Sequence, residues 1–233
     1  MGHAFRIRFH PRARRIKLKV RRDASLEVVA PPGTSERKIR RFVEDSGDWV
    51  ERTLARMPVR DSQDLEAGPF PDVLRLRALQ QRAAVAWVDS ARRTFRWTGR
   101  GVQIGLPQRE PRIAHAVLVA ALKAHAVQAL EPRFRALAER LDKRLNKTPA
   151  RVTWRNQKTR WGSCSPSGNI SLNIRLLFLP PQLVDYVFVH ELAHLEHPDH
   201  SPRFWNALEV LLPGASEQRR AIRSADHLLP DWI

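Results

Sequence analysis

Four histidines lie close together in the segment VHELAHLEHPDHSPRFW, which runs from Val189 to Trp205. His190 and His194 are four residues apart, so on a helix their Cβ atoms lie ~5–6 Å apart on one face. Two imidazoles at that spacing can bind one Zn²⁺. Glu191 lies beside such a metal, where its carboxylate can accept a proton from water that the metal activates. The His-Glu-x-x-His pattern therefore predicts a zinc-dependent hydrolase with Glu191 as the general base.

A third ligand is expected after a break in this helix, because a catalytic zinc normally has three protein ligands. Pro198 ends the helix, and Ser201 followed by Pro202 is typical of the start of a new one. The turn between them can fold His200 back toward the first two histidines. The spacing of the three equals the metzincin pattern H-E-x-x-H-x-x-G-x-x-H, with His197 in place of the glycine.

Other side chains compete with His200 for the third position on the metal: Glu196, His197, Asp199 and Glu209. Glu209 is the main rival, because a glutamate from the following helix would give a gluzincin-type site. His197 is expected close to the metal or facing the substrate. A metal-free set of histidines, on the surface or in a core network, is the remaining alternative.

The segment RWGSCSPSGNISLNIRLLFLPPQLVDYVFVHELAHLEHPDHSPRFW closely resembles the YgjP-like metallopeptidase family, in the zincin group that includes SprT-like proteases. The resemblance covers 151–213 with specific motifs and the rest of the chain more loosely. It implies a peptide or protein substrate, Zn²⁺ as cofactor, and Glu191 as the general base. It implies zinc ligands at three positions: His190, His194 and His200.

Four further residues are candidates for contact with the substrate or the transition state. Arg160 and Lys158 can neutralise an anionic substrate or an oxyanion, although Arg160 is equally suited to an ion pair within the fold. Tyr186, one turn before the first histidine, can donate a hydrogen bond, and His197 can face the substrate. Cys164 can reach the zinc as a thiolate, or be a buried inert thiol, which is the more common outcome.

The pattern of apolar residues favours an α+β fold. The helix QLVDYVFVHELAHL is apolar nearly all round, so we expect it to be buried. Residues 112–146 predict one long helix with a kink at Pro132. Alternation and composition predict strands at 4–9, 15–21, 26–30, 74–76, 84–88, 93–97, 102–106, 151–154 and 169–177.

These elements predict a zincin-like core over 111–233, with the histidine-bearing helix packed on a small sheet. A β-rich region with one helix, capped by Ser35, is expected over 1–110, and 57–71 is the best linker. The strand at 169–177 is a candidate sheet edge for binding an extended peptide.

Composition limits the setting of the protein. With one cysteine, no apolar run of ~18–20 residues and no signal-peptide pattern, the chain is expected to be cytoplasmic without a membrane span. The net charge of +17 predicts weak, salt-sensitive binding of nucleic acid or nucleotides, unless it reflects only an arginine-rich composition.

Metallopeptidase activity is the leading interpretation, and two alternatives keep the metal. One is a nucleotide pyrophosphohydrolase, which lacks support from a Gly-rich phosphate loop or a carboxylate cluster for Mg²⁺. The other is a nucleic-acid-associated protease of the SprT-like type. A binding module with structural zinc fits less well, because such sites are normally four-coordinate and rich in cysteine.

Overall fold

The computed structural model describes residues 5–20, 26–56, 71–141, 144–145 and 147–233. The chain divides into two compact units, Met1–Gln63 and Asp64–Ile233. The linker predicted at 57–71 lies almost entirely outside the described residues. The sequence analysis grouped 71–110 with the N-terminal region, whereas contacts in the structure group it with the histidine-bearing helices.

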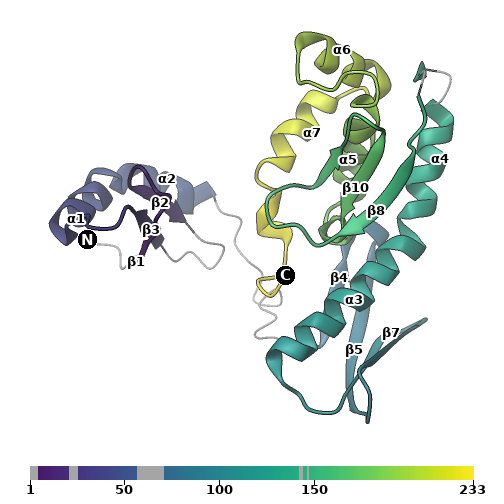
Figure 1. The fold of residues 1–233 in the computed structure, drawn as a ribbon, viewed down its shortest axis with the longest axis horizontal. Helices are drawn as coiled ribbons and strands as arrows, with labels where there is room; N and C mark the ends of the chain where they lie inside the picture. Colours follow the sequence, from purple (N-terminus) through teal and green to yellow (C-terminus); the bar gives the residue numbers. More distant parts are fainter. Residues whose placement is uncertain (1–4, 21–25, 57–70, 142–143, 146) are drawn as a thin grey trace. The chain divides into compact units, whose positions relative to one another are not determined.

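The N-terminal unit is a three-stranded sheet with two helices (Figure 1). The strand order is β1-β3-β2, and β3 is parallel to β1 and antiparallel to β2. Alternate residues of β3 pack with the first helix in a small core of Val28, Ala30, Ile39 and Val43. The single helix predicted here is two helices that meet at Ser46. The elements are β1 (Phe5–Phe9), β2 (Lys17–Val20), β3 (Leu26–Ala30), α1 (Glu36–Asp45) and α2 (Gly47–Arg56).

The larger unit begins with a four-stranded sheet in the order β4-β5-β7-β6. Its strands are β4 (Val73–Leu76), β5 (Gln81–Asp89), β6 (Thr94–Thr98) and β7 (Gly101–Leu106). The long helix predicted next is two helices, α3 (Pro111–Ala129) and α4 (Glu131–Leu141). The break at Leu130 precedes Pro132, which has no backbone N–H to continue the helical hydrogen bonds. In Figure 1, α3 crosses this sheet and α4 continues beside β8.

The second sheet of this unit has the strand order β8-β10-β9. Its strands are β8 (Arg151–Arg155), β9 (Gly162–Cys164) and β10 (Asn169–Asn173). β10 is therefore central, and the prediction that this strand is a free edge is wrong. The predicted strand also stops at Asn173, because Ile174–Phe178 form a 3₁₀ helix.

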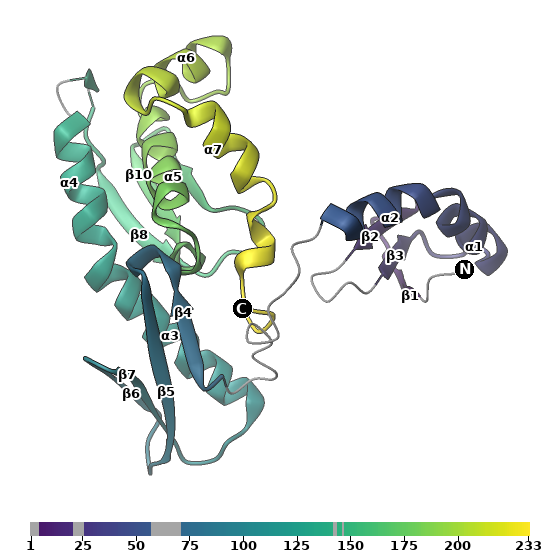
Figure 2. The ribbon, with the colours of Figure 1, turned by 180° about the vertical axis from the view of Figure 1, so that it is seen from behind.

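The C-terminal helices are α5 (Pro181–Ala193), α6 (Pro202–Leu211) and α7 (Ala215–Ile222). α5 lies between α4 and α7 (Figure 2). Phe188 of α5 is fully buried and packs edge-on against Phe134 of α4, with ring centroids 5.2 Å apart. This burial confirms the α+β fold and the buried histidine helix that the sequence predicted.

Within the described residues, one helical stretch is long and apolar enough to cross a membrane by length and composition alone: Pro111–Leu141. One third of its most apolar window, 33%, is buried in the protein. Leu118 and Leu122 of this stretch pack in the main core. A core helix of a soluble protein passes the same test, so this stretch is weak support for a membrane span.

Candidate metal centre

Three histidine side chains meet where the chain turns from α5 into α6. His190 is in the last turn of α5, His194 follows its last residue, and His200 lies just before α6. One ring nitrogen of each lies within 4.8 Å of those of the other two. The Nε2 atoms of His190 and His200 are 3.1 Å apart. In the part of the chain that is described, this is the one group of three or more His, Cys, Asp or Glu side chains arranged to hold a metal.

The imidazole of His194 is oriented by the main chain. Its Nδ1 lies 2.9 Å from the carbonyl oxygen of His197. A carbonyl oxygen only accepts, so this contact places the proton on Nδ1 and leaves the Nε2 lone pair for a metal. His197 thus contributes its backbone to the site, while its side chain is half-buried.

Two aromatic residues of α6 hold the three rings in place. Phe204 is fully buried and contacts each of them, with centroid distances of 4.9, 4.4 and 4.9 Å to His190, His194 and His200. Trp205 stacks on His200 with ring centroids 5.3 Å apart, and its Nε1 donates to the His200 carbonyl at 2.9 Å. Sequence reasoning missed both roles, although aromatic residues after a metal-ligand turn are a readable signal.

The three imidazoles suit a zinc ion. Two nitrogen ligands bound tetrahedrally at 2.0–2.1 Å lie about 3.3 Å apart, close to the 3.1 Å between His190 and His200. Burial lowers the pKa of His190 to about 3 and also lowers that of His194. Both rings are therefore neutral at pH 7, the form that binds metal. A bound cation would accept the lone pairs of ring nitrogens on half-buried imidazoles, and none of the three histidines carries a negative charge that would balance it.

Glu191 is buried beside this cluster and lacks a partner for one oxygen. The residue is 5% exposed, and its Oε2 has no hydrogen-bond partner among the described residues. Burial raises the pKa of Glu191 to about 8, and the positive charge of Arg160 opposes that rise. A carboxylate that titrates near neutral pH is suited to accept and return a proton.

Gly162 leaves the space that the Glu191 carboxylate occupies. A Cβ at this position would lie 2.6 Å from Glu191 Oε1 and 2.8 Å from Cγ. Gly162 is the first residue of β9 and pairs with Leu172 of β10. The glycine is needed here for close approach of side chain and backbone.

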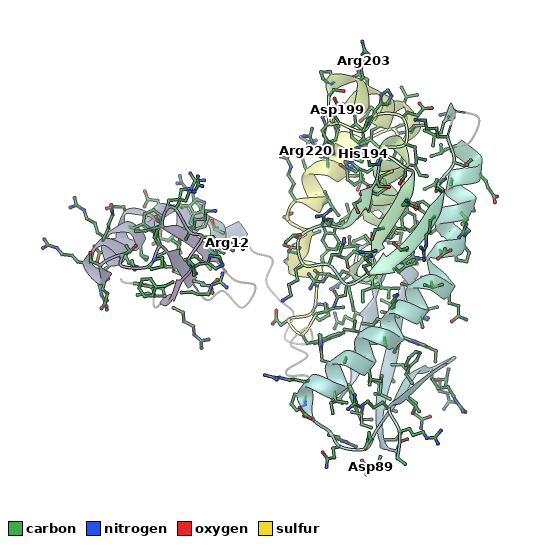
Figure 3. All side chains as sticks on the ribbon, viewed as in Figure 1. Arg12, Asp89, His194, Asp199, Arg203 and Arg220 are labelled. Carbon is green, nitrogen blue, oxygen red and sulfur yellow. The ribbon has the colours of Figure 1, made fainter. Side chains whose placement is uncertain are left out.

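The side chains that compete with His200 for the third position on the metal form other interactions. The carboxylate of Glu209 accepts hydrogen bonds from the N–H groups of Gly214 (2.6 Å) and Ser216 (3.2 Å), at the start of α7. Asp199 accepts from the Ser201 N–H at 3.2 Å, and hydrogen bonding to Ser201 lowers the pKa of Asp199. Ser201 occupies the N-cap position without the side-chain cap that the sequence predicted. His194 and Asp199 are labelled at this end of the larger unit in Figure 3.

Glu196 and Cys164 also lie outside the imidazole group. The thiol of Cys164 donates to the Ser165 carbonyl at 3.5 Å. Burial raises the pKa of this thiol to about 11, with a smaller contribution from Glu191. A thiol with so high a pKa is protonated at neutral pH, which matches the inert alternative.

The predicted substrate contacts are spread around the cluster. Tyr186 is 4% exposed, and its ring centroid is 5.7 Å from that of His190. Arg160 and Lys158 are exposed and line one pocket near β9. The positive charge of Arg160 opposes the rise in the pKa of Glu191.

Asn173 fixes the loop that carries these cations, a role that sequence reasoning left open. Its side chain is 1% exposed, and its Nδ2 donates to the carbonyl oxygens of Gln157 and Arg160, both at 2.7 Å. An amide that bridges two carbonyls of one loop restrains its backbone. Asn173 therefore supports the wall of the site, while Asn169 bonds to Ser167 in a neighbouring turn.

The fold and this cluster define a metallopeptidase. The chain matches the YgjP-like metallopeptidase domain over residues 14–225. The protein therefore belongs to the YgjP-like family, which confirms the resemblance seen in its sequence. Family membership also confirms a metal-dependent peptidase domain in general terms, on an α+β fold with a zincin-like core.

One solved structure is also similar to part of the chain. It is the crystal structure of the metallopeptidase zymogen of Pyrococcus abyssi abylysin, at 30% sequence identity and a TM-score of 0.35. The similarity covers 39% of this chain and 92% of that one. No curated protein matches the chain.

Proposed function

We propose that the protein is a zinc-dependent metallopeptidase in which Glu191 is the general base. The proposed zinc ligands are His190, His194 and His200. The observation that carries the proposal is the buried, unpaired Glu191 carboxylate next to three converging imidazoles. When bound, zinc would supply a Lewis acid that polarises the scissile carbonyl and lowers the pKa of water.

The chain's own residues supply the remaining steps. Glu191 accepts the proton of the attacking water at its carboxylate and returns it to the leaving amine. Gly162 keeps that carboxylate next to the imidazoles. Tyr186, one turn before His190 on α5, and Arg160, in the loop before β9, are the proposed donors to the oxyanion. β9 lies at the end of its sheet, so we assign it, in place of β10, as the strand that pairs with an extended peptide.

Zinc analysis combined with peptide cleavage tests this proposal. The purified protein should contain about one zinc per chain and cleave casein or a peptide mixture. A chelator should stop cleavage, and added zinc should restore it. Full cleavage by protein stripped of metal would contradict the proposal.

A nucleotide pyrophosphohydrolase remains the alternative for the same site. Release of pyrophosphate from nucleoside triphosphates, measured with and without chelator, separates it from peptidase activity. Metal-dependent pyrophosphate release without peptide cleavage would favour the alternative.

The N-terminal unit favours a second function, binding of nucleic acid. Val28 of β3 packs toward the helices, so Glu27 and Val29 face the other side of the sheet. Glu27 forms an ion pair with Arg8, with 3.6 Å between Arg8 Nε and Glu27 Oε1. The residues paired with Glu27 and Val29 in the neighbouring strands are all cationic: Arg6, Arg8, Lys17 and Lys19.

This sheet face and the following loop form a cationic hollow of ≈ 470 Å³. Among the described residues, six Lys and Arg side chains line it together with His10, and no carboxylate does. Like charges held this close repel one another, and a phosphate backbone would relieve the repulsion while releasing counterions. We infer salt-sensitive binding without sequence preference, as a protease associated with nucleic acid would need.

Two matched triple variants of the full-length protein test this binding function. R12Q/R14Q/R15Q removes charge from the hollow, and R37Q/K38Q/R41Q removes equal charge from the exposed face of α1. The first should weaken binding to a mixed-sequence DNA duplex by about tenfold or more. It should also lower the number of phosphate contacts, obtained from the slope of log K against log salt concentration, by about two to three. Equal losses in the two variants would show that only overall charge matters.

A further inference from the structure

A cationic pocket lies beside the start of β9, close in sequence to Gly162, the residue that packs against Glu191. It has a volume of ≈ 290 Å³ and is formed by the loop 157–161, the last residue of β10, Arg175 of the 3₁₀ helix that follows, the last residue of α7 and the chain after it. Trp161 lines it, and the next residue is Gly162, which lies against Glu191. The pocket therefore begins one residue from the contact that positions the general base.

Four cationic side chains and one carboxylate line this pocket, an excess of three positive charges: Lys158, Arg160, Arg175, Arg223 and Asp226. The Arg175 Nε donates to Asn156 at 3.2 Å. Lys158, Arg160 and Arg223 form no ion pair with a carboxylate among the described residues. These three charges remain available to a ligand.

The pocket wall is restrained before any ligand binds. Asn173 holds the carbonyl groups of Gln157 and Arg160, as described above. The side-chain oxygen of Gln157 is buried and has no donor among the described residues. The pocket thus offers a hydrogen-bond acceptor together with its cations, which suits a ligand that carries both an anionic group and an N–H.

α7 and the residue after it connect this pocket to the imidazole cluster. The Arg219 guanidinium lies 3.5 Å from the ring centroid of Trp205, and Trp205 stacks on His200. Arg223 lies one helical turn further along and lines the pocket. Burial raises the pKa of Tyr186, and the charges of both arginines oppose this rise, so both act at the same edge of the site.

We propose that this pocket is a substrate subsite for the side chain of an aspartate or glutamate near the scissile bond of a peptide. The proposal rests on the peptidase function proposed above. A peptide fits the pocket better than a triphosphate, because its backbone N–H can donate to Gln157 while its carboxylate meets Arg223, Arg160 and Lys158. A nucleoside triphosphate has anionic groups but no N–H beside them.

A charge reversal at Arg223 with a matched control tests the subsite. R220E makes the same charge change on α7, but Arg220 is exposed, lies outside the pocket and projects from the helix (Figure 3). Zinc-loaded wild type, R223E and R220E are compared on a peptide library and on matched peptides that carry Glu, Gln or Lys at the selected position. Thermal unfolding verifies the fold, and K158E provides a second reversal within the pocket.

The wild type and R220E should cleave the Glu peptide with a kcat/KM at least about tenfold above that of the Gln peptide. R223E and K158E should lower this ratio, and R223E should shift the preference toward Lys. A library without acidic preference, or equal ratios in R223E and R220E, would overturn the subsite while leaving the peptidase function intact.

A binding measurement keeps the subsite testable if no peptide is cleaved, an outcome that counts against the peptidase function itself. In fluorescence anisotropy with zinc-loaded E191Q protein, the Glu peptide should bind more tightly than the Gln peptide, and adding R223E should abolish the difference. Equal binding of the two peptides would overturn the subsite. Tighter, Arg223-dependent binding of ATP than of the Glu peptide would assign the pocket to a phosphate ligand and overturn it too.

Discussion

Gly162 and Glu191 are in such close contact that a single methyl group between them would displace the carboxylate. Gly162→Ala should therefore move Glu191 and reduce kcat/KM by about 10–100-fold, because small displacements of a catalytic group are costly. Zinc content should stay at the wild-type level, since the three atoms nearest to the added Cβ all belong to Glu191 and none to an imidazole. Gly47→Ala is the control, because a Cβ there meets no atom within 4 Å. Equal activities of the two variants would contradict the assigned contact.

His200 is predicted to be the third zinc ligand, and Glu209 a cap for α7. His200→Ala should lower zinc affinity strongly and leave the fold in place. Glu209→Ala should retain zinc but lose about 0.5–2 kcal/mol of stability, as the removal of a helix cap does. Isothermal titration with zinc and urea unfolding of both variants measure these effects. Loss of zinc from Glu209→Ala with full binding by His200→Ala would reverse the assignment.

Trp205 should hold His200 in its binding position. Trp205→Phe keeps an aromatic ring to stack on His200 but removes the Nε1 donor to the His200 carbonyl. Zinc affinity is expected to fall by about tenfold, at the lower end of what outer partners of metal ligands contribute. A competition titration against a chelator gives the affinity. An unchanged affinity would mean that stacking alone positions the turn.

Ionisation of Glu191 should make the metal-free protein less stable as the pH rises. Its pKa of about 8 in the folded state lies above the ordinary value of 4.5 for this carboxyl, so between these pH values the folded state binds more protons than the unfolded state. The free energy of unfolding therefore falls with rising pH, by ~1.4 kcal/mol per unit of pKa difference at most. Urea unfolding of metal-free wild type and Glu191→Gln at pH 5, 7 and 9 should show the wild type losing stability relative to the variant. Parallel pH profiles would argue against the buried, unpaired carboxylate.

Local patterns explain why much of the fold was predictable. Alternating apolar and polar residues predicted the strands β4 to β7, and the apolar run around His190 predicted a buried helix. Both are readable because an element with a buried face repeats its apolar residues at a regular interval. Breaks were harder. The helix predicted over 112–146 is interrupted at Leu130, two residues before Pro132, and continues as α4 to Leu141, and the second helix after Ser35 has no strong local signal.

The convergence of the three histidines was predictable because their spacing lies within one helix and one turn. Contacts between residues that are far apart in the sequence were not predictable. Gly162 is 29 positions from Glu191, and only the pairing of β9 with β10 shows why this residue is glycine. The same holds for Arg223, which reaches the pocket through the packing of α7 on α5. Register and packing depend on many weak contacts that no short motif records.

The most direct test of the account is the zinc content and the peptidase rate of Glu191→Gln, measured on the same sample. Glutamine has nearly the same size and is not among the three proposed ligands, so zinc should stay at about one per chain. Because the amide cannot accept the proton of water, kcat/KM on a fluorogenic peptide should fall by about 10²–10⁴-fold. Loss of zinc from this variant would make Glu191 a ligand, and a wild-type rate with zinc bound would contradict its role as the general base.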